Sequence, residues 1–183
     1  MIKAQENIEI ITQAPIQSLK LPLGWFEDEP DYGPLPTSFK RRFRSFVAPT
    51  SELMICYRGQ PIDPDSCENL MRLLSERTQV LTKSKVNAIS QVLGNMRHES
   101  VFRALLIRTE TICARNVLTV EGRWSNGDDA YCLFLPEEPG SSHIIELHYQ
   151  APKEEFRKNL AAMRGAFASL TWISNTLSDQ TNE

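Results

Sequence analysis

Few residues of this chain have types and spacings that could support metal binding. The histidines are His98, His143 and His148. In an extended strand, residues 143 and 148 have opposite parity, so their side chains point to opposite faces of the sheet and do not form a pair of ligands. The four cysteines contain no CxxC motif, and no spacing of cysteine with histidine fits a zinc site. We therefore expect no metal site and no cofactor.

Nucleophilic catalysis has equally little support. The sequence has no GxSxG motif and no phosphate-binding loop. Ser141, Ser142 and His143 follow a Pro-Gly pair and are typical of a polar hairpin loop. Glu121 and Glu146 could face one another across strands and act as a pair of carboxylates, provided that a cleft surrounds them. A small hydrolase with such a cleft is one alternative.

Two charged segments that contain aromatic residues are the best candidates for a binding surface. Residues 25–31, WFEDEPD, are acidic, and residues 39–46, FKRRFRSF, are basic. A basic strand with aromatic residues can bind phosphates or nucleic-acid bases. It can also be an edge strand that its cations protect from aggregation, neutralised by the acidic loop. The predicted binding residues are Trp25, Tyr32, Lys40, Arg41, Arg42, Phe43 and Arg44.

The length and the net charge of the chain limit the number of domains and the kinds of partner that we expect. A chain of 183 residues predicts a single domain, here residues 16–172, with an N-terminal segment 1–15 and a polar tail 173–183. The net charge of −3 disfavours nucleic acid as the partner. The N-terminus has no continuous apolar run, and no stretch approaches the about 20 apolar residues of a membrane span. We expect a cytoplasmic protein with reduced cysteines.

The first half of the chain predicts strands followed by two helices. Alternating apolar residues in IEIIT, IQSLKLPLGWF, FKRRFRSFV and SELMICYRG are typical of strands. Asp63 and Pro64 predict the N-cap and first residue of a helix. Apolar residues at helical spacing then continue in both helices. They are Cys67, Leu70, Met71 and Leu74 in the first, and Val86, Ile89, Leu93 and Met96 in the second.

The second half predicts an antiparallel meander closed by a helix. The strands VFRALLIRTETI, VLTVEGRW, AYCLFLP and HIIELHYQ are joined by the turns CARN, SNGDD and EEPGSS. After Ala151-Pro152, a helix carries its apolar residues on one face, which should cover one face of the sheet. These residues are Phe156, Leu160, Met163, Phe167 and Leu170. The predicted fold class is α+β, an antiparallel sheet flanked by helices in an α/β/α sandwich.

The segments LTVEGRW, AYCLFLP, HIIELHYQAPKEEFRKNL and AFASLTW resemble the C-terminal half of the PsbP and Mog1-like superfamily. The upstream LPLGWFE is similar to the entry segment of many members, so the resemblance spans residues 16–172. It implies a non-catalytic scaffold used for binding. Mog1-like members bind a small GTPase and PsbP-like members attach to a photosynthetic membrane complex, but no contact residue of either group matches a position here.

The function expected from these observations is a non-catalytic protein-binding or accessory module. The charged, aromatic-bearing segments 25–31 and 39–46 would form its contact surface, and the partner would be another protein. The alternatives are a small hydrolase with a carboxylate cleft, and phosphate or nucleic-acid binding through the basic strand 39–46.

Overall fold

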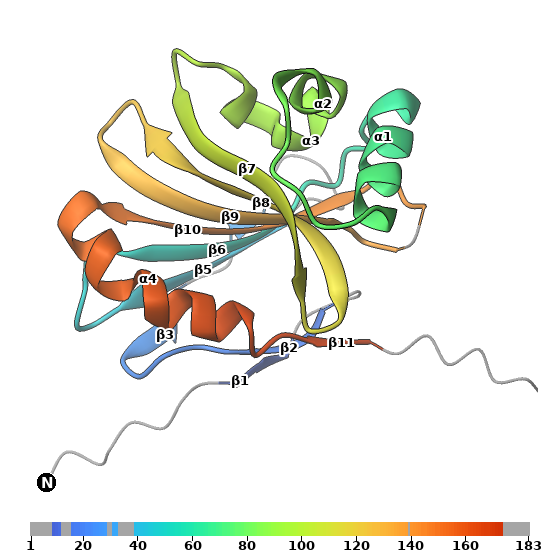
Figure 1. Ribbon diagram of the computed structural model, residues 1–183. Helices are drawn as coiled ribbons and strands as arrows, with labels where there is room; N and C mark the ends of the chain where they lie inside the picture. Colours follow the sequence, from blue (N-terminus) through green and yellow to red (C-terminus); the bar gives the residue numbers. More distant parts are fainter. Residues whose placement is uncertain (1–8, 12–15, 29–30, 33–38, 139, 174–183) are drawn as a thin grey trace, which may run out of the picture.

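A large antiparallel sheet forms the centre of the computed structural model (Figure 1), which describes residues 9–11, 16–28, 31–32, 39–138 and 140–173. The strand order is β3-β5-β6-β10-β9-β8-β7, and β4 pairs with β5. The strands are β3 (Trp25–Glu27), β4 (Asp31–Tyr32), β5 (Phe39–Ser45), β6 (Glu52–Tyr57), β7 (Phe102–Ile112), β8 (Arg115–Trp124), β9 (Asp128–Pro136) and β10 (Ile144–Pro152).

The strands β7 to β10 form the predicted meander. Cys113 and Ala114 join β7 to β8 with φ values of 48° and 64°, as a type I′ hairpin requires. Gly127, at φ 98°, forms the next turn and donates its N–H to the carbonyl of Trp124. Pro139, in the third predicted turn, lies outside the described residues. The meander places β9 on one side of β10, and β6 pairs with its other side.

One face of the large sheet is covered by α4 (Lys153–Phe167) and by a smaller sheet with the order β1-β2-β11 (Figure 1). The strands of this smaller sheet are β1 (Glu9–Ile11), β2 (Ile16–Lys20) and β11 (Thr171–Trp172). The rings of Phe156 and Phe167 stack on Tyr149 and Tyr131, with centroids 5.3 Å and 5.4 Å apart. The predicted covering helix is therefore confirmed.

Helices also cover part of the opposite face, next to β7, β8 and β9 (Figure 1). They are α1 (Pro64–Ser75), α2 (Lys83–Ala88), α3 (Ser90–Leu93) and the 3₁₀ helix η1 (Gly94–Arg97). Asp63 caps α1 by accepting a hydrogen bond from the backbone N–H of Ser66 at 2.8 Å. The α+β class, with helices on both faces of an antiparallel sheet, agrees with the sequence analysis. None of the described helices combines the length and apolar composition needed to cross a membrane.

The prediction of the second helix was wrong in one respect, because the segment forms two short helices and not one continuous helix. Ile89, with φ −117° and ψ 23°, separates α2 from α3, and Gly94 at φ 55° ends α3. The apolar period still holds, since Ile89, Leu93 and Met96 are all buried against the sheet. The chain therefore keeps its buried residues while it turns along the edge of the sheet.

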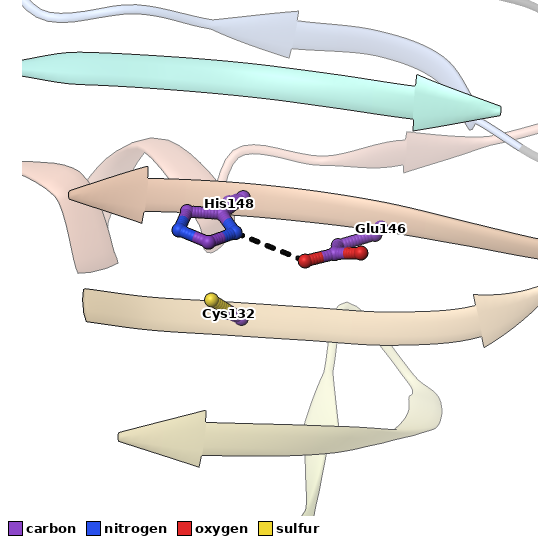
Figure 2. A group of neighbouring side chains, drawn as sticks. All are labelled: Cys132, Glu146 and His148. Atoms are coloured by element: carbon purple, nitrogen blue, oxygen red, sulfur yellow. Dashed lines mark hydrogen bonds and ion pairs between the residues drawn. The ribbon is translucent and has the colours of Figure 1, made fainter. Parts of the chain in front are cut away.

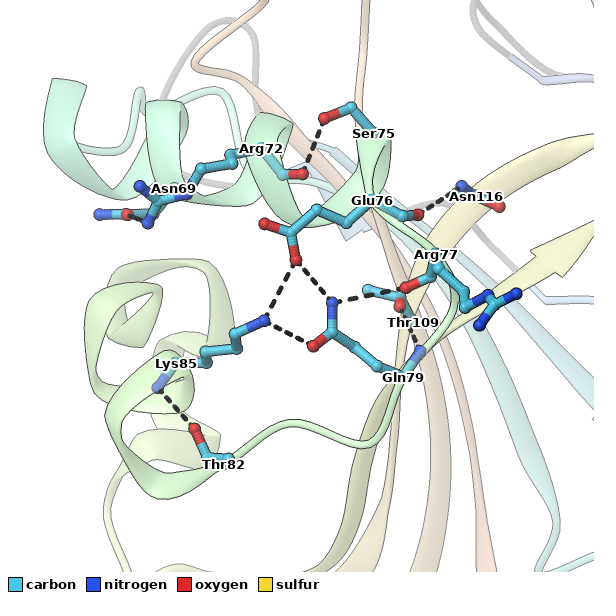
Figure 3. A network of polar contacts seen from close by, with 10 residues as sticks. All are labelled: Asn69, Arg72, Ser75, Glu76, Arg77, Gln79, Thr82, Lys85, Thr109 and Asn116. Carbon is cyan, nitrogen blue, oxygen red and sulfur yellow. Dashed lines mark hydrogen bonds and ion pairs between the residues drawn. The ribbon is translucent and has the colours of Figure 1, made fainter.

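A polar network attaches these helices to the sheet (Figure 3). Glu76 Oε2 accepts hydrogen bonds from Gln79 Nε2 at 2.7 Å and from Lys85 Nζ at 3.1 Å. The backbone N–H of Gln79 donates to Thr109 Oγ1 on β7 at 3.0 Å, and Asn116 Nδ2 on β8 donates to the carbonyl of Leu74 at 2.8 Å. The connection between α1 and α2 is thus held against β7 and β8.

Candidate functional site

The helices leave the part of this face formed by β5, β6 and β10 uncovered, and a pocket of about 680 Å³ lies there. We call it the β10 pocket. Its residues on strands are Lys40 from β5, Met54 and Cys56 from β6, Trp124 at the end of β8, and Glu146, His148 and Gln150 from β10. The residues on the opposite wall include Arg58, Gln60, Gln91, Asn95, Met96 and Arg97.

Strand alternation explains why polar residues line this pocket. Along β10 the odd-numbered residues Ile145, Leu147 and Tyr149 face the core under α4, so that the even-numbered Glu146 and His148 face the pocket. The register sets His148 opposite Cys132 on β9 and Glu146 opposite Cys56 on β6. Residues far apart in the chain therefore meet on one face.

Glu146 and His148 form a hydrogen-bonded pair at the floor of the pocket (Figure 2). Nδ1 of His148 lies 2.9 Å from Oε1 of Glu146, and Nη2 of Arg58 donates to the other carboxylate oxygen at 3.2 Å. The side chain of His148 is only 6% exposed and that of Glu146 is 15% exposed. Cys132 lies beside them, fully buried.

The other ring nitrogen of His148, Nε2, contacts Trp124 and Gln150. Nε2 lies 3.3 Å from the indole N–H of Trp124 and 3.1 Å from Oε1 of Gln150. The indole and imidazole rings are stacked, with planes 12° apart. Nε2 of Gln150 donates to Glu52 at 3.1 Å, and Glu52 pairs with Arg42 at 2.7 Å. A polar chain therefore runs from His148 at the floor of the pocket to Arg42 on β5.

The charges in this floor are set by burial and by these contacts. Burial raises the pKa of Glu146, but hydrogen bonds and positive charge from His148 and Arg58 outweigh it, so that its pKa is lowered and it is a carboxylate. Burial, followed by the charge of Glu146, raises the pKa of the Cys56 thiol to about 12 and raises that of Cys132. Both thiols are protonated at neutral pH.

The pocket has more positive than negative side chains. Among the described residues that line it, Lys40, Arg58 and Arg97 are cationic and Glu146 is a carboxylate. Arg97 is exposed, and its Nε donates to His98 at 3.2 Å. Lys40 is half-buried and has no ion pair or side-chain hydrogen bond with any residue that the structure describes.

Two of the predicted aromatic residues, Trp25 and Phe43, lie away from the pocket. Trp25 and Phe43 are 3% and 1% exposed and belong to the core under α4, where Trp25 packs edge-on against Tyr149. Tyr32 is in β4, which pairs with β5, and its side chain lies outside the described residues. The loop between β4 and β5, residues 33–38, also lies outside them.

The predicted arginines are each paired with a carboxylate. Arg41 Nε lies 2.7 Å from Glu27, and Arg44 Nε lies 3.1 Å from Asp28, both residues of the acidic segment. Arg42 pairs with Glu52 of the neighbouring strand. Among the described side chains of the predicted set, Lys40 lines the pocket. Arg42 is connected through Glu52 to Gln150, which also lines it.

The proposed pairing of Glu121 with Glu146 is wrong. β9 separates β8 from β10, and Glu121 bonds Arg164 of α4 on the opposite face of the sheet from the pocket. The sequence analysis also did not single out Arg58, Trp124 or the combination of Cys132 with His148. The alternation in HIIELHYQ indicated that Glu146 and His148 share a face, but the contact with Cys132 depends on the register between β9 and β10.

No family model and no curated protein matches this chain. Among solved structures, it is similar to the solution structure of cyanobacterial PsbP (CyanoP) from Synechocystis sp. PCC 6803. The identity is 12%, the match covers 88% of this chain and 95% of that chain, and the TM-score is 0.49. This similarity agrees with the resemblance seen in the sequence, and no conclusion about the family or function of this chain is drawn from it.

Proposed function

We propose that this protein is a non-catalytic binding module, and that the β10 pocket receives an acidic segment of another protein. The observation that carries this proposal is the excess of positive side chains in an open pocket, with the ammonium group of Lys40 unpaired among the described residues. A ligand with carboxylate groups complements this charge.

The state of the titratable groups argues against catalysis. A general base must reach a substrate proton, but both ring nitrogens of His148 and both oxygens of Glu146 already contact protein atoms. A cysteine nucleophile acts as the thiolate, and burial keeps the thiols of Cys56 and Cys132 protonated. These groups hold the shape of the pocket floor.

The apolar residues of the pocket suit a polypeptide ligand. Met54, Met96 and Trp124 contribute to its lining. Methionine side chains adapt to irregular surfaces, and tryptophan is frequent at the energetic centre of interfaces. The volume of about 680 Å³ is sufficient for one or two side chains of a partner.

The alternatives gain less support. Phosphate or nucleic-acid binding through residues 39–46 requires free cations, whereas Arg41, Arg42 and Arg44 are each within 3.1 Å of a carboxylate. A small hydrolase requires a substrate-accessible acid or base in the β10 pocket, whereas the polar atoms of Glu146 and His148 already contact protein atoms. We also propose that the protein works in the cytoplasm, where the four free thiols would stay reduced.

The test compares binding of a fluorescent Glu-rich peptide and a matched Gln-rich peptide by anisotropy. Wild type should bind the Glu-rich peptide more tightly, and the affinity should fall as salt is added, because exposed charges are screened. The variant Lys40→Glu should bind at least about tenfold more weakly, the equivalent of ~1.4 kcal/mol.

The matched control is Lys158→Glu, which makes the same charge change on the exposed side of α4. It should bind like wild type, and thermal melts should establish that both variants fold. Equal loss in the two variants would indicate non-specific attraction, and equal binding of the two peptides would exclude an acidic segment as the ligand. Both results would overturn the proposal.

A further inference from the structure

Three potential metal ligands of different chemistry meet at the floor of the β10 pocket (Figure 2). The donor atoms of Cys132, Glu146 and His148 all lie within 4.8 Å of one another. They come from two neighbouring strands, β9 and β10, whose register is continuous across nine residue pairs. The backbone that carries the ligands is thus rigidly paired.

The contact between Glu146 and His148 requires a hydrogen atom or a metal ion between its two polar atoms. Nδ1 and Oε1 are 2.9 Å apart, and the lone pair of a nitrogen without a proton would repel a carboxylate oxygen at that distance. Either a proton on Nδ1 or a metal ion must lie between the two atoms. The sulfur of Cys132 is placed to be a third donor to such an ion.

We propose that Cys132, Glu146 and His148 bind a thiophilic divalent cation, with zinc as the expected metal. A thiolate, an imidazole and a carboxylate together match the ligands that zinc takes in proteins. Three protein ligands leave a fourth position, and since Glu146 and His148 line the β10 pocket, that position opens toward the pocket.

The surrounding side chains supply the outer contacts that metal ligands need. Arg58 holds Oε2 of Glu146, which leaves Oε1 as the coordinating oxygen. When Nδ1 of His148 binds the metal, Nε2 carries the proton. It then gives up the hydrogen bond that it accepts from the indole N–H of Trp124 and donates to Oε1 of Gln150, 3.1 Å away. Gln150 is itself held by Glu52. Such partners fix the orientation and tautomer of a ligating histidine.

Binding would change the protonation of the site in a balanced way. The S–H bond of Cys132 breaks, a metal–sulfur bond forms, and one proton leaves to the solvent. The proton on Nδ1 of the neutral imidazole of His148 moves to Nε2, and the metal takes its place on Nδ1. Tetrahedral zinc holds sulfur and nitrogen donors roughly 3.5 Å apart, so the three side chains would close around the ion by rotation of their χ angles.

This inference does not depend on the proposed binding of an acidic segment. It concerns the floor of the pocket and is tested with the metal alone. Failure of peptide binding would leave the metal site standing, and absence of metal binding would leave the peptide result unchanged.

The experiment adds Co²⁺ to chelator-treated protein and follows its absorption spectrum. Wild type should give the visible bands of tetrahedral cobalt and a near-ultraviolet band from thiolate to metal, and Zn²⁺ should displace both. Cys132→Ala should lose the thiolate band. Glu146→Gln, which keeps the shape of the side chain, should weaken Zn²⁺ binding in calorimetry at least about tenfold, since even outer contacts are worth roughly 10–100-fold.

The matched control is Cys113→Ala, which removes the exposed thiol of the β7–β8 turn and should leave the cobalt spectrum unchanged. If the thiolate band persists in Cys132→Ala and disappears in Cys113→Ala, the metal is held by a surface thiol and the proposal is wrong. The absence of the band in wild type would overturn it as well. Should Cys132→Ala fail to fold, the calorimetry of Glu146→Gln decides.

Discussion

At the scale of single residues, two glycines in regular elements have opposite reasons for being there. Gly122 lies in β8 opposite Ala104 and Ala130, and a Cβ built on it would overlap the ring of Phe102. Gly165 lies on the exposed face of α4, where a Cβ would meet nothing. The first glycine is required by packing, whereas the second is not.

We predict that Gly122→Ala and Gly165→Ala change stability in opposite directions. Gly122→Ala should destabilise the protein by about 1–3 kcal/mol through overpacking. Gly165→Ala should stabilise it by about 0.5–1 kcal/mol, because alanine loses less conformational entropy in a helix. Urea denaturation measures both. Each variant is the control for the other. Stabilisation by Gly122→Ala would contradict the packing of β7 on β8, and destabilisation by Gly165→Ala would contradict the open surroundings of Gly165.

Also at the residue scale, Arg58 connects several parts of the pocket. Its guanidinium group bonds Glu146 and the carbonyl of Gln91, and it lies 5.5 Å from the ring centroid of Phe134. One side chain thus links the segment after β6 to α3 and to β10. A buried carboxylate without this partner would lose one of the charges that keep it ionised.

At the scale of elements, α1 begins where the sequence predicted because its N-cap is local. Asp63 accepts from Ser66 within the same turn, and Pro64 occupies the first helical position. The hydrogen bonds from Ser66 lower the pKa of Asp63 below its usual range. The carboxylate form therefore stabilises the folded state at pH values above the unfolded pKa of this group.

We predict that Asp63→Asn separates the charge of this cap from its hydrogen bond. Asparagine also caps helices but is neutral, so wild type should be more stable than the variant at neutral pH. Because the folded-state pKa is lowered, that advantage should be lost as the pH falls through it. Urea denaturation at neutral and acidic pH measures the difference. A difference that is constant with pH would mean that the charge contributes nothing.

The same scale explains why the second predicted helix is interrupted. The apolar period of Ile89, Leu93 and Met96 was recognisable, but the period of buried residues does not specify that the backbone stays helical between them. The chain breaks at Ile89 and Gly94 and still buries the same side chains. Tertiary packing selects the path when propensity is weak.

At the scale of the whole molecule, the two layers around the sheet give the four cysteines different environments. Cys113 is exposed at a hairpin turn, Cys67 and Cys56 are partly buried, and Cys132 is fully buried between β8 and β10. Burial also raises the pKa of Cys56 and Cys132, which lowers the fraction of reactive thiolate.

We predict a corresponding order of reaction with an aromatic disulfide reagent in the presence of a chelator. One thiol should react rapidly in the native protein, and Cys113→Ala should remove that phase. Cys132 should react only when denaturant unfolds the chain, which absorbance and mass spectrometry of tryptic peptides can establish. Rapid labelling of Cys132 in the native protein would contradict the packing of the helices on the sheet.

The sequence by itself determined the local features of this protein. Turn residues, proline positions and hydrophobic period depend on neighbours in the chain, so that the meander, the N-cap of α1 and the apolar face of α4 were all predictable. The same alternation implied that Glu146 and His148 share one face of a strand.

Only the tertiary structure decided what those residues meet. The pairing of β6 with β10 brings Arg58 to Glu146, and the register of β9 brings Cys132 to His148. The tertiary structure also buries Trp25 and Phe43 in the core, although they lie in the charged segments that were expected to form the contact surface. Strand pairing between distant segments has no period or motif in a single sequence, and a shift of one residue would turn every side chain to the other face.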